Sequence, residues 1–420
     1  MISQPWIIIT LYYKNLEIKT LVSLKLDKDP FILLCDDWKR KNLLFTEPKE
    51  IICARNEEDL WKAFSYLEEA RLAGKWLAGY ISYEAGFLFE KRLKPLASFN
   101  RKTPLLCFGI FDKPVFQNYN QQLLKYSKEV LTESFLKDLH VTWSFDVYQK
   151  KFQQFHQSLQ RGDSFQGNLT MPITASWTGD PLAVFFSLIN YQPVPYGAFI
   201  AMEEPLILSR SPELFFRIDN NLQIETRPMK GTMPRGKTIS EDQEIIENLR
   251  TDVKNLAENR MIVDLLRNDI SRISLEETLQ TPDLFKIETY TTVHQMVSSV
   301  RGQLKKNLSI KDIFSALFPC GSVTGVPKIR TMELLHGIEE EPRDVYCGAI
   351  GFISPQNTMC FSVAIRTLSL FRQNKAVLNV GSGIVYDSNA WQEYQECLLK
   401  ARFAMMNKTS DCSYPDDFFQ

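Results

Sequence analysis

Four short segments that alternate apolar and polar residues follow one another between residues 197 and 228. They are GAFIAM (197–202), LILSRS (206–211), LFFRI (214–218) and LQIETRP (222–228). Strands of this kind belong to antiparallel sheets with one face in water, whereas the strands of a buried parallel sheet are apolar throughout. The run therefore predicts consecutive antiparallel strands and argues against a doubly wound parallel sheet.

Longer segments with helical spacing separate these strands. Residues 145–163 place apolar side chains three and four apart and end at Gly162, as expected for an amphipathic helix. Ser240 and Gln243 form a capping-box pattern that predicts the start of one long helix through residue 269. Further helices are predicted at 329–337, ending at Gly337, and at 390–406. Strands and helices in separate groups predict an α+β fold.

The chain has 420 residues, which is long for one ordinary core, so we expect one very large domain or two. Residues 1–140 mix short apolar runs with charged helical patterns, and a polar stretch at 117–130 indicates an edge strand or an approaching boundary. We expect an N-terminal region at 1–140 that packs on a core domain at 145–407, followed by a polar tail at 408–420.

Composition excludes several classes of protein. The chain carries 49 basic and 50 acidic residues, so its net charge of −1 gives no general surface for nucleic acid or membranes. No run reaches about 18 apolar residues, and the first 14 residues predict a strand rather than a signal peptide. The eight cysteines form no C-x-x-C pair, and with four histidines a zinc site is not expected. We expect a reduced, cytoplasmic protein.

The stretch KGTMPRGKT (230–238) contains the P-loop pattern G-x-x-x-x-G-K-T. A P-loop follows a buried parallel strand and leads directly into a helix. Here the preceding segment alternates like a half-exposed strand, and the helix cap is expected only at Ser240. The sequence MIVD (261–264) lies within a helical pattern and does not resemble a Walker B strand. We therefore predict that Lys237 is a solvated lysine and that Lys230 is the lysine of interest.

Acidic and cationic residues elsewhere could complete a site around Lys230. Glu393, Glu396 and Lys400 share one face of a predicted helix, and Glu258 lies on another. Two carboxylate helices that face each other suit Mg²⁺, which prefers oxygen ligands. Arg366 and the backbone of the VGSGIV segment (380–385) form a carboxylate-binding set.

These features occur in an order that resembles the chorismate-utilising enzymes. The matching segments are SPELFF, RPMKGTMPRG, LAENRMIVDLLRNDISRI, VHQMVSSVRGQL, LFPCGSVTGVPKIRTMELL, YCGAIGFIS, FSVAIRTL, VGSGIVYDSN and EYQECLLKA. The resemblance covers residues 145–406 densely, and GYISYEAGFLFE (79–90) extends it weakly to the N-terminal part. It implies a large sandwich of antiparallel sheets flanked by helices, with chorismate and Mg²⁺ in a central cleft of the catalytic domain at 145–407.

Two positions distinguish members of this family. Isochorismate and salicylate synthases have a water-activating lysine where this chain has Gln166, so the resemblance disfavours addition of water. Anthranilate synthases usually have alanine in P-I-A-G-T, whereas PMKGT here is similar to the P-I-K-G-T of aminodeoxychorismate synthases. In that pattern the lysine is a covalent nucleophile.

The resemblance also implies the role of each candidate residue. Lys230 is the nucleophile, Glu213 the general acid, and His294 a third catalytic residue. Mg²⁺ is held by Glu258 and Glu396, with Glu393 acting through water. The substrate is held by Gly231, Thr232, Tyr346, Arg366, Gly381, Ser382, Gly383 and Lys400.

The implied reaction joins chorismate and ammonia to form 4-amino-4-deoxychorismate, a step toward 4-aminobenzoate and folate. Cys320 is predicted to be a packing residue rather than the nucleophile of a glutamine amidotransferase, so glutamine-derived ammonia would come from a separate amidotransferase subunit in a heterodimer. The alternatives are anthranilate synthase component I, a P-loop nucleotide-binding protein and a non-catalytic chorismate-binding regulator.

Overall fold

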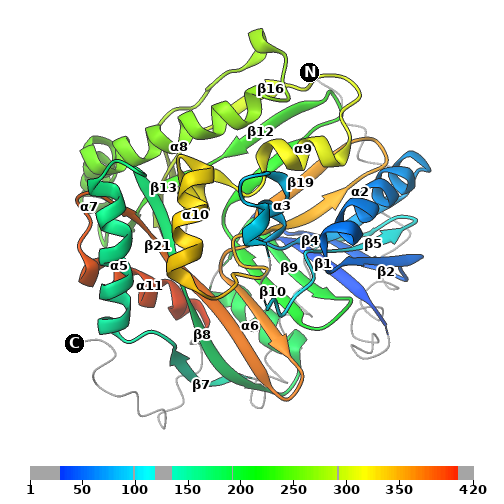
Figure 1. Cartoon of the computed structure of the whole chain (residues 1–420), viewed down its shortest axis with the longest axis horizontal. Helices are drawn as coiled ribbons and strands as arrows, with labels where there is room; N and C mark the ends of the chain where they lie inside the picture. The colour runs from blue at the N-terminus through cyan, green and yellow to red at the C-terminus, as the bar shows by residue number, and fades with distance from the viewer. Residues whose placement is uncertain (1–28, 98–99, 119–134, 192, 291–292, 405–420) are drawn as a thin grey trace.

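The computed structural model describes residues 29–404, apart from 98–99, 119–134, 192 and 291–292 (Figure 1). The strand predicted in the first 14 residues, most of the polar stretch at 117–130 and the tail at 408–420 lie outside the described residues. None of the described helices is long and apolar enough to cross a membrane.

Two large sheets form the body of the molecule, and every strand pair within them is antiparallel. The first sheet contains, in spatial order, β17 (Gly325–Val326), β8 (Gln166–Thr178), β21 (Lys375–Val385), β20 (Thr367–Phe371), β10 (Leu206–Ser211), β9 (Tyr196–Ala201), β1 (Phe31–Asp36), β2 (Lys41–Thr46) and β6 (Val115–Asn118), with β7 (Phe135–Val141) beside β8.

The second sheet has eight strands. Its order is β16 (Val300–Gln303), β12 (Gln223–Arg227), β11 (Leu214–Ile218), β19 (Met359–Val363), β18 (Ala349–Ile353), β4 (Trp76–Ile81), β5 (Leu106–Phe111) and β3 (Glu50–Ala54). A separate three-stranded sheet consists of β13 (Met229–Pro234), β15 (Val293–Val297) and β14 (Lys286–Thr289).

The two large sheets pack face to face with helices on their outer faces. An apolar cluster between them joins Ile32 and Ile200 of the first sheet to Tyr80 and Ile350 of the second. The outer face of the first sheet is covered by α5 (Phe145–Gln160), α6 (Pro181–Tyr191), α10 (Lys328–Glu339) and α11 (Ala390–Ala401). The outer face of the second is covered by α2 (Glu57–Leu72), α8 (Val253–Ser271) and α9 (Ile310–Leu317). The short helix α3 (Ala85–Phe89) follows β4.

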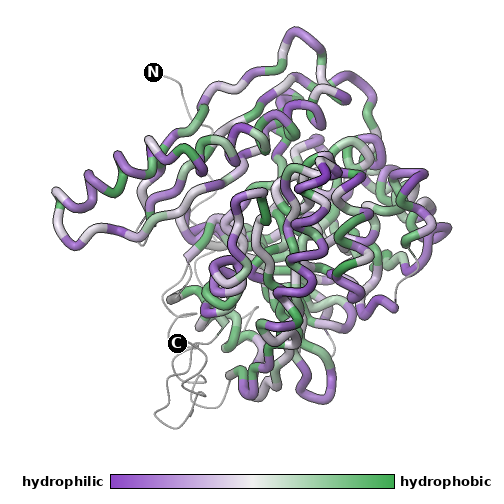
Figure 2. The backbone as a smooth tube through the Cα atoms, turned by 60° about the vertical axis from the view of Figure 1, so that its left-hand side comes forward, coloured by the Kyte–Doolittle hydropathy of each residue, from purple (hydrophilic) through white to green (hydrophobic). Residues whose placement is uncertain are grey.

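This arrangement confirms the predicted α+β sandwich of antiparallel sheets flanked by helices. Apolar stretches run through the packed body, and hydrophilic stretches lie on outer helices and loops (Figure 2). Segments from residues 31–118 enter both sheets, since β1 pairs with β9 and β4 pairs with β18. The described N-terminal part therefore contributes strands to the same sheets as residues 145–404.

Several helix boundaries differ from the sequence prediction, and α11 ends at Ala401 rather than at residue 406. The long helix expected through residue 269 is two helices, α7 (Ile239–Thr251) and α8, because Asp252 is extended and caps Asn255 N–H at 2.6 Å. The cap of α7 is Thr238, two residues before the predicted cap Ser240, and both side chains offer a hydroxyl group. Gly337 lies inside α10, which ends instead at Glu339 and is followed by Glu340 with a left-handed φ of 64°.

Cys53 and Cys107 lie directly opposite each other on β3 and β5. Their sequence separation of 54 residues gave no sign of this pairing, because it depends on the register of two strands.

Candidate active site

Lys230 lies at a bulge in the three-stranded sheet. Met229 pairs with Val297 and Thr232 with Gln295, so Lys230 and Gly231 together oppose the single residue Met296. Gly231 has a φ of +86°, which glycine adopts without strain. Bulges redirect side chains and are common beside active sites. The half-buried Lys230 side chain makes no hydrogen bond or ion pair with the described residues.

The Lys230 ammonium faces a bare stretch of β21. Its Nζ lies 3.3 Å from the point where a Cβ on Gly383 would stand, and the amide Nε2 of Gln166 lies 3.0 Å from the same point. A Cβ on Gly381, on the same face of β21, would stand 2.8 Å from the Leu169 carbonyl. The two glycines thus leave space beside Lys230. Gln166 is buried, and its Oε1 has no hydrogen-bond partner in the part of the chain that the structure describes.

The Ser382 side chain points to the opposite face of β21. Its hydroxyl lies 3.1 Å from the phenol oxygen of Tyr148 on α5. Of the predicted set at 381–383, only the two glycines therefore face Lys230, because side chains alternate along a strand.

Glu213, between β10 and β11, is buried within electrostatic range of Lys230. Burial raises the pKa of Glu213 to about 7, although a hydrogen bond from Ser322 and the charges of Lys230 and Lys400 oppose the shift. Its Oε1 has no hydrogen-bond partner among the described residues. A carboxyl group that is protonated near neutral pH suits a general acid.

Lys400 connects helix α11 to the glycine stretch of β21. Its Nζ donates to the Gly381 carbonyl at 2.9 Å and lies 2.7 Å from Glu396 Oε1. Partial burial would raise the pKa of Glu396, but the ammonium groups of Lys400, Lys230 and Lys254 outweigh it and lower that pKa. Glu396 is therefore ionised and surrounded by cations.

The other two predicted metal ligands, Glu258 and Glu393, are both near Lys254. Glu258 on α8 lies 4.0 Å from Lys254. Burial raises the pKa of Glu393 on α11, opposed by a hydrogen bond to Ser388 and by the charge of Lys254. Lys254 thus lies within electrostatic range of carboxylates from both helices. The described residues nevertheless contain no group of three or more His, Cys, Asp or Glu side chains already arranged around a metal position.

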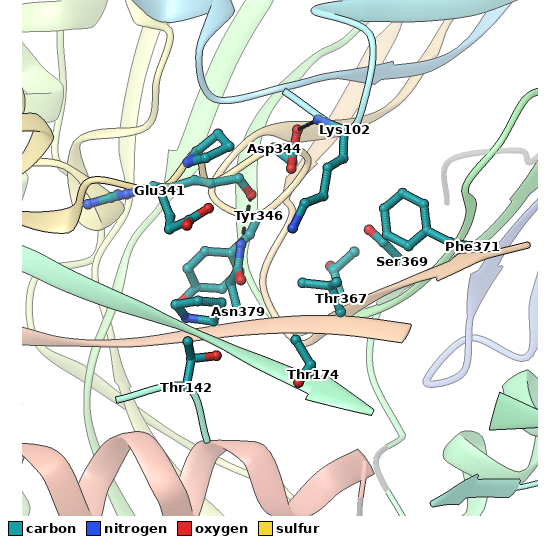
Figure 3. Close-up of a pocket in the computed structure, with 14 residues that line it drawn as sticks. Lys102, Thr142, Thr174, Glu341, Asp344, Tyr346, Thr367, Ser369, Phe371 and Asn379 are labelled. Atoms are coloured by element: carbon teal, nitrogen blue, oxygen red, sulfur yellow. Dashed lines mark hydrogen bonds between the residues drawn. The ribbon is translucent and has the colours of Figure 1, made fainter. Parts of the chain in front are cut away.

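Arg366 and Tyr346 offer groups that bind anions. Arg366, after β19, is half-buried with a φ of 52°, and its guanidinium makes no hydrogen bond or ion pair with the described residues. Tyr346 is buried, which raises its phenol pKa well above the ordinary value, so the hydroxyl stays a donor. Tyr346 lines a pocket of about 110 Å³, into which Thr367 and Asn379 also point (Figure 3).

His294 lies elsewhere in the three-stranded sheet. It is fully buried, with Nδ1 2.9 Å from Thr289 Oγ1 and Nε2 2.8 Å from Asp242 Oδ1. Asp242 also accepts bonds from Arg235 and from Gly236 N–H. Within the described part of the chain, His294 therefore joins β15 to the first turn of α7 and bonds to neither Lys230 nor Glu213.

The antiparallel strand β13 excludes the P-loop interpretation, whereas the position of the cap of α7 does not. Gly231, Thr232 and Pro234 lie within β13, which is antiparallel to β15, so no phosphate-binding loop precedes α7. The helix does begin directly after Lys237, contrary to the prediction. Lys237 and Thr232 are exposed, as predicted for Lys237.

Several neighbours of the site were not singled out from the sequence. Asn168 and Ser322 lie beside it on β8 and in the turn η3 (Gly321–Val323), Arg343 after α10 donates to the carbonyls of Asn168 and Val323, and Lys254 lies on α8. Asn168 and Ser322 belong to the segments GDSFQGNLT and GSVTGVPK, whose small polar residues were the available signal.

The family model described as "chorismate binding enzyme" matches residues 29–406. The chain belongs to this family. The chain is 36% identical over 339 residues to "Aminodeoxychorismate synthase component 1" of Escherichia coli, and the alignment covers 77% of this chain and 74% of that protein. It is 33% identical over 371 residues to "Anthranilate synthase component 1" of Methanothermobacter thermautotrophicus, covering 83% and 79%.

A solved structure agrees with this placement of the chorismate-binding enzyme. Anthranilate synthase component I from Streptococcus pneumoniae TIGR4 superposes with a TM-score of 0.75 at 27% sequence identity, covering 86% of this chain and 91% of that one. Relatives with two different names, aminodeoxychorismate synthase and anthranilate synthase, thus resemble this enzyme to a similar extent, so the choice between them depends on individual residues.

Proposed function

We propose that this chorismate-binding enzyme is an aminodeoxychorismate synthase component I, which converts chorismate and ammonia to 4-amino-4-deoxychorismate. The observation that carries the proposal is the placement of Lys230: a bulge directs an unpaired amine toward the bare Gly381–Gly383 stretch, within electrostatic range of Glu213. An amine nucleophile and an acid with a pKa of about 7 are the pair that displacement of a hydroxyl group requires.

The proposed reaction has two displacements. The neutral amine of Lys230 attacks C2 of the ring, both ring double bonds shift by one position, and the C4 hydroxyl leaves as water after protonation by Glu213. Ammonia then attacks C4, both double bonds shift back, and the C2–lysine bond breaks. The enolpyruvyl group stays on the ring throughout. Arg366, Tyr346 and Lys400 would bind the enolpyruvyl carboxylate, and the buried amide of Gln166 would leave water unactivated.

Mg²⁺ is part of this proposal. Carboxylates from α8 and α11 already share a cation, Lys254, and carboxylate oxygens are the ligands that Mg²⁺ prefers. The residues therefore fit a cation site, and Glu258 and Glu396 would hold the ion with Glu393 nearby. When bound, Mg²⁺ would supply the positive charge that holds the ring carboxylate.

Ammonia would come from a separate glutamine amidotransferase subunit. Such an enzyme needs a reactive cysteine, but Cys320 is buried and burial raises its thiol pKa to about 12. This protonated thiol packs in the turn beside Glu213 and does not suit a nucleophile.

Product analysis tests the proposal against anthranilate synthase component I, whose relatives are similarly close. The purified enzyme would be incubated with chorismate, Mg²⁺ and ammonium at pH 8, and products would be separated and weighed by mass spectrometry. We expect an amino product that retains the enolpyruvyl carbons. Formation of free pyruvate together with anthranilate would refute the proposal in favour of the second reaction.

A further inference from the structure

Arg343 is a buried arginine between α10 and β18 that the proposed reaction does not use. Its residue is 2% exposed, and its guanidinium makes four hydrogen bonds. Nε and Nη2 donate to the two oxygens of Glu339 at 2.8 and 2.6 Å, Nη1 donates to the Val323 carbonyl at 2.9 Å, and Nη2 donates to the Asn168 carbonyl at 2.7 Å. One side chain thus holds three separate segments.

The Arg343–Glu339 ion pair completes an edge of the first sheet. The short strand β17 pairs with β8 only at Gln166 and Gly167. Beyond it, the Asn168 carbonyl accepts from Arg343, and the Thr170 N–H donates to Glu339 Oε1 at 3.1 Å. Buried backbone groups without partners are costly, so the ion pair takes the place of a neighbouring strand here.

The segments held in this way carry groups of the candidate active site. The Asn168 amide lies 3.2 Å from the Cβ position of Gly381, and Gln166 lies two residues earlier on the same face of β8. Val323 follows Ser322, which hydrogen-bonds to Glu213. The main-chain carbonyl of Arg343 also accepts from Asn379 of β21 at 2.9 Å, as the dashed line in Figure 3 shows.

We infer that Arg343, held by Glu339, is a positioning residue that fixes β8 and the Gly321–Val323 turn relative to β21 and thereby sets the spacing of Gln166, Glu213 and Lys230. This inference rests on the proposed function only in assuming that these three residues surround the reacting substrate. Arg343 acts through its neighbours and does not contact the substrate.

Arginine and lysine differ in how they can serve this role. The planar guanidinium binds both Glu339 oxygens and two carbonyls at fixed angles, whereas an ammonium group is a single point of charge. Arg343→Lys therefore keeps the buried charge but loses the fixed geometry of the three segments. A displacement of about 1 Å in a catalytic site costs about 10²-fold in rate.

The test compares Arg343→Lys with the matched control Arg71→Lys. Arg71 on α2 has a side chain that is 11% exposed and also pairs with a glutamate, Glu68, and with Asn357, but it bonds to none of the site residues. Chorismate consumption would be measured well below the melting temperature of each variant. For Arg343→Lys we expect kcat to fall about 10²-fold with little change in KM, and for Arg71→Lys we expect kcat to stay at the wild-type value.

The pH dependence of kcat provides a second readout, which a loss of stability alone would not shift. The Ser322 hydrogen bond lowers the pKa of Glu213. A displaced turn would break this bond and raise the pKa, so the alkaline limb of the rate should move to higher pH in Arg343→Lys. Ser322→Ala should give the same movement while Arg343 is intact. A wild-type kcat and pH profile in folded Arg343→Lys, or an equal loss of kcat in Arg71→Lys, would overturn the inference.

If Arg343→Lys does not fold, Glu339→Gln carries the same test, because it keeps the side-chain shape and one oxygen acceptor. An unchanged kcat in Glu339→Gln would also overturn the inference. Chorismate consumption is the reference whatever product forms, so a different product would refute the proposed function and leave this comparison intact.

Discussion

Lys230 and Arg366 are two cations of the predicted site that make no ion pair with the described residues. Burying a charge is costly unless a partner compensates it. Both side chains are only half-buried, which keeps this cost moderate, and a substrate with two carboxylates would supply the missing anions. The two cations therefore indicate a site that is completed by its substrate.

Replacement of Lys230 should separate the two lysines of the KGTMPRGKT stretch. We expect Lys230→Ala to lower kcat for amination by about 10³-fold or more, since removing a nucleophile takes away a whole reaction route. Lys237→Ala should leave kcat unchanged, because Lys237 is exposed and donates to Glu241 through its backbone N–H. Steady-state kinetics with ammonium at saturating chorismate would measure both variants, and a severe loss in Lys237→Ala alone would reverse the assignment.

Glu213 predicts the pH dependence of the reaction. Its pKa is raised to about 7, and a general acid works only when protonated, so the Glu213-dependent rate should fall as pH rises through 7. Glu213→Gln cannot donate this proton and should lower kcat by about 10²–10⁴-fold and abolish that limb. A pH series with both proteins would show this, and normal turnover of Glu213→Gln would exclude it as the acid.

Residue types could be chosen from the sequence better than their orientation. Lys230, Glu213 and Arg366 were identified by motif; the structure brings Glu213 within electrostatic range of Lys230, and the roles of all three residues stay predictions. Ser382 was grouped with its neighbouring glycines, but strand alternation turns its side chain toward Tyr148. His294 also lies in a matching motif, yet Asp242 and Thr289 occupy both its nitrogens. Such contacts depend on register and on distant segments.

At the scale of elements, strand β21 and the bulge in β13 create the space for the nucleophile. The bulge turns Lys230 toward β21, and two glycines two residues apart leave positions 381 and 383 on that face of β21 without side chains. Lys400 of α11 bonds to the same strand at Gly381. Strand β13, which carries Lys230, and helix α11, which carries Lys400, therefore approach strand β21 through separate contacts.

Gly383→Ala should reduce activity without unfolding the protein. A Cβ there would stand 3.3 Å from Lys230 Nζ and 3.0 Å from Gln166 Nε2, and both are the ends of flexible side chains that can move. We expect kcat to fall about 10²-fold through displacement of Lys230, with a melting temperature close to that of the wild type. Circular dichroism and steady-state kinetics would measure the two effects.

Gly337→Ala is the control for that substitution. A Cβ on Gly337 in α10 would meet no atom within 4 Å, so this variant should keep full activity and gain about 0.5–1 kcal/mol in stability. Full activity in Gly383→Ala would contradict the assigned position of Lys230.

Helix positions were predicted more reliably than helix ends. The apolar spacing correctly located α5, α8, α10 and α11, but the same spacing continued across Asp252, where the chain breaks into α7 and α8. Thr238 and Ser240 are equivalent by chemistry, and only the backbone conformation decides which of them caps α7. Local patterns therefore gave the elements, and backbone geometry gave their limits.

At the scale of the whole molecule, a buried network joins the N-terminal segments to the catalytic ones. Glu84, which follows β4, accepts from Arg343 N–H at 2.7 Å, and Asp344 accepts from Thr103 N–H at 3.1 Å. Burial raises the pKa of Glu84 to about 8, with a further contribution from Asp344. Alternating segments predicted the antiparallel sandwich, but the sequence did not show that residues 31–118 enter both sheets, because pairing across that distance leaves no periodic signal.

This network should make stability depend on pH. The folded pKa of Glu84 lies above the ordinary value of 4.5, so its protonated form stabilises the fold below pH 4.5, and this contribution is lost as pH rises through about 8. Glu84→Gln cannot ionise and should lose less stability than the wild type between pH 6 and pH 9. Urea unfolding at both pH values would measure this, and equal losses in both proteins would rule out Glu84 as the source.

The central claim is that Lys230 forms a bond to the substrate, and intact-protein mass spectrometry tests it most directly. The enzyme would be mixed with chorismate and Mg²⁺ in the absence of ammonia, and the digested protein would be mapped for modified residues. The account predicts an adduct with the mass of chorismate minus water on Lys230 that disappears when ammonium is added. Rapid conversion of chorismate on subsequent addition of ammonium, with no adduct on Lys230 at any time, would contradict it.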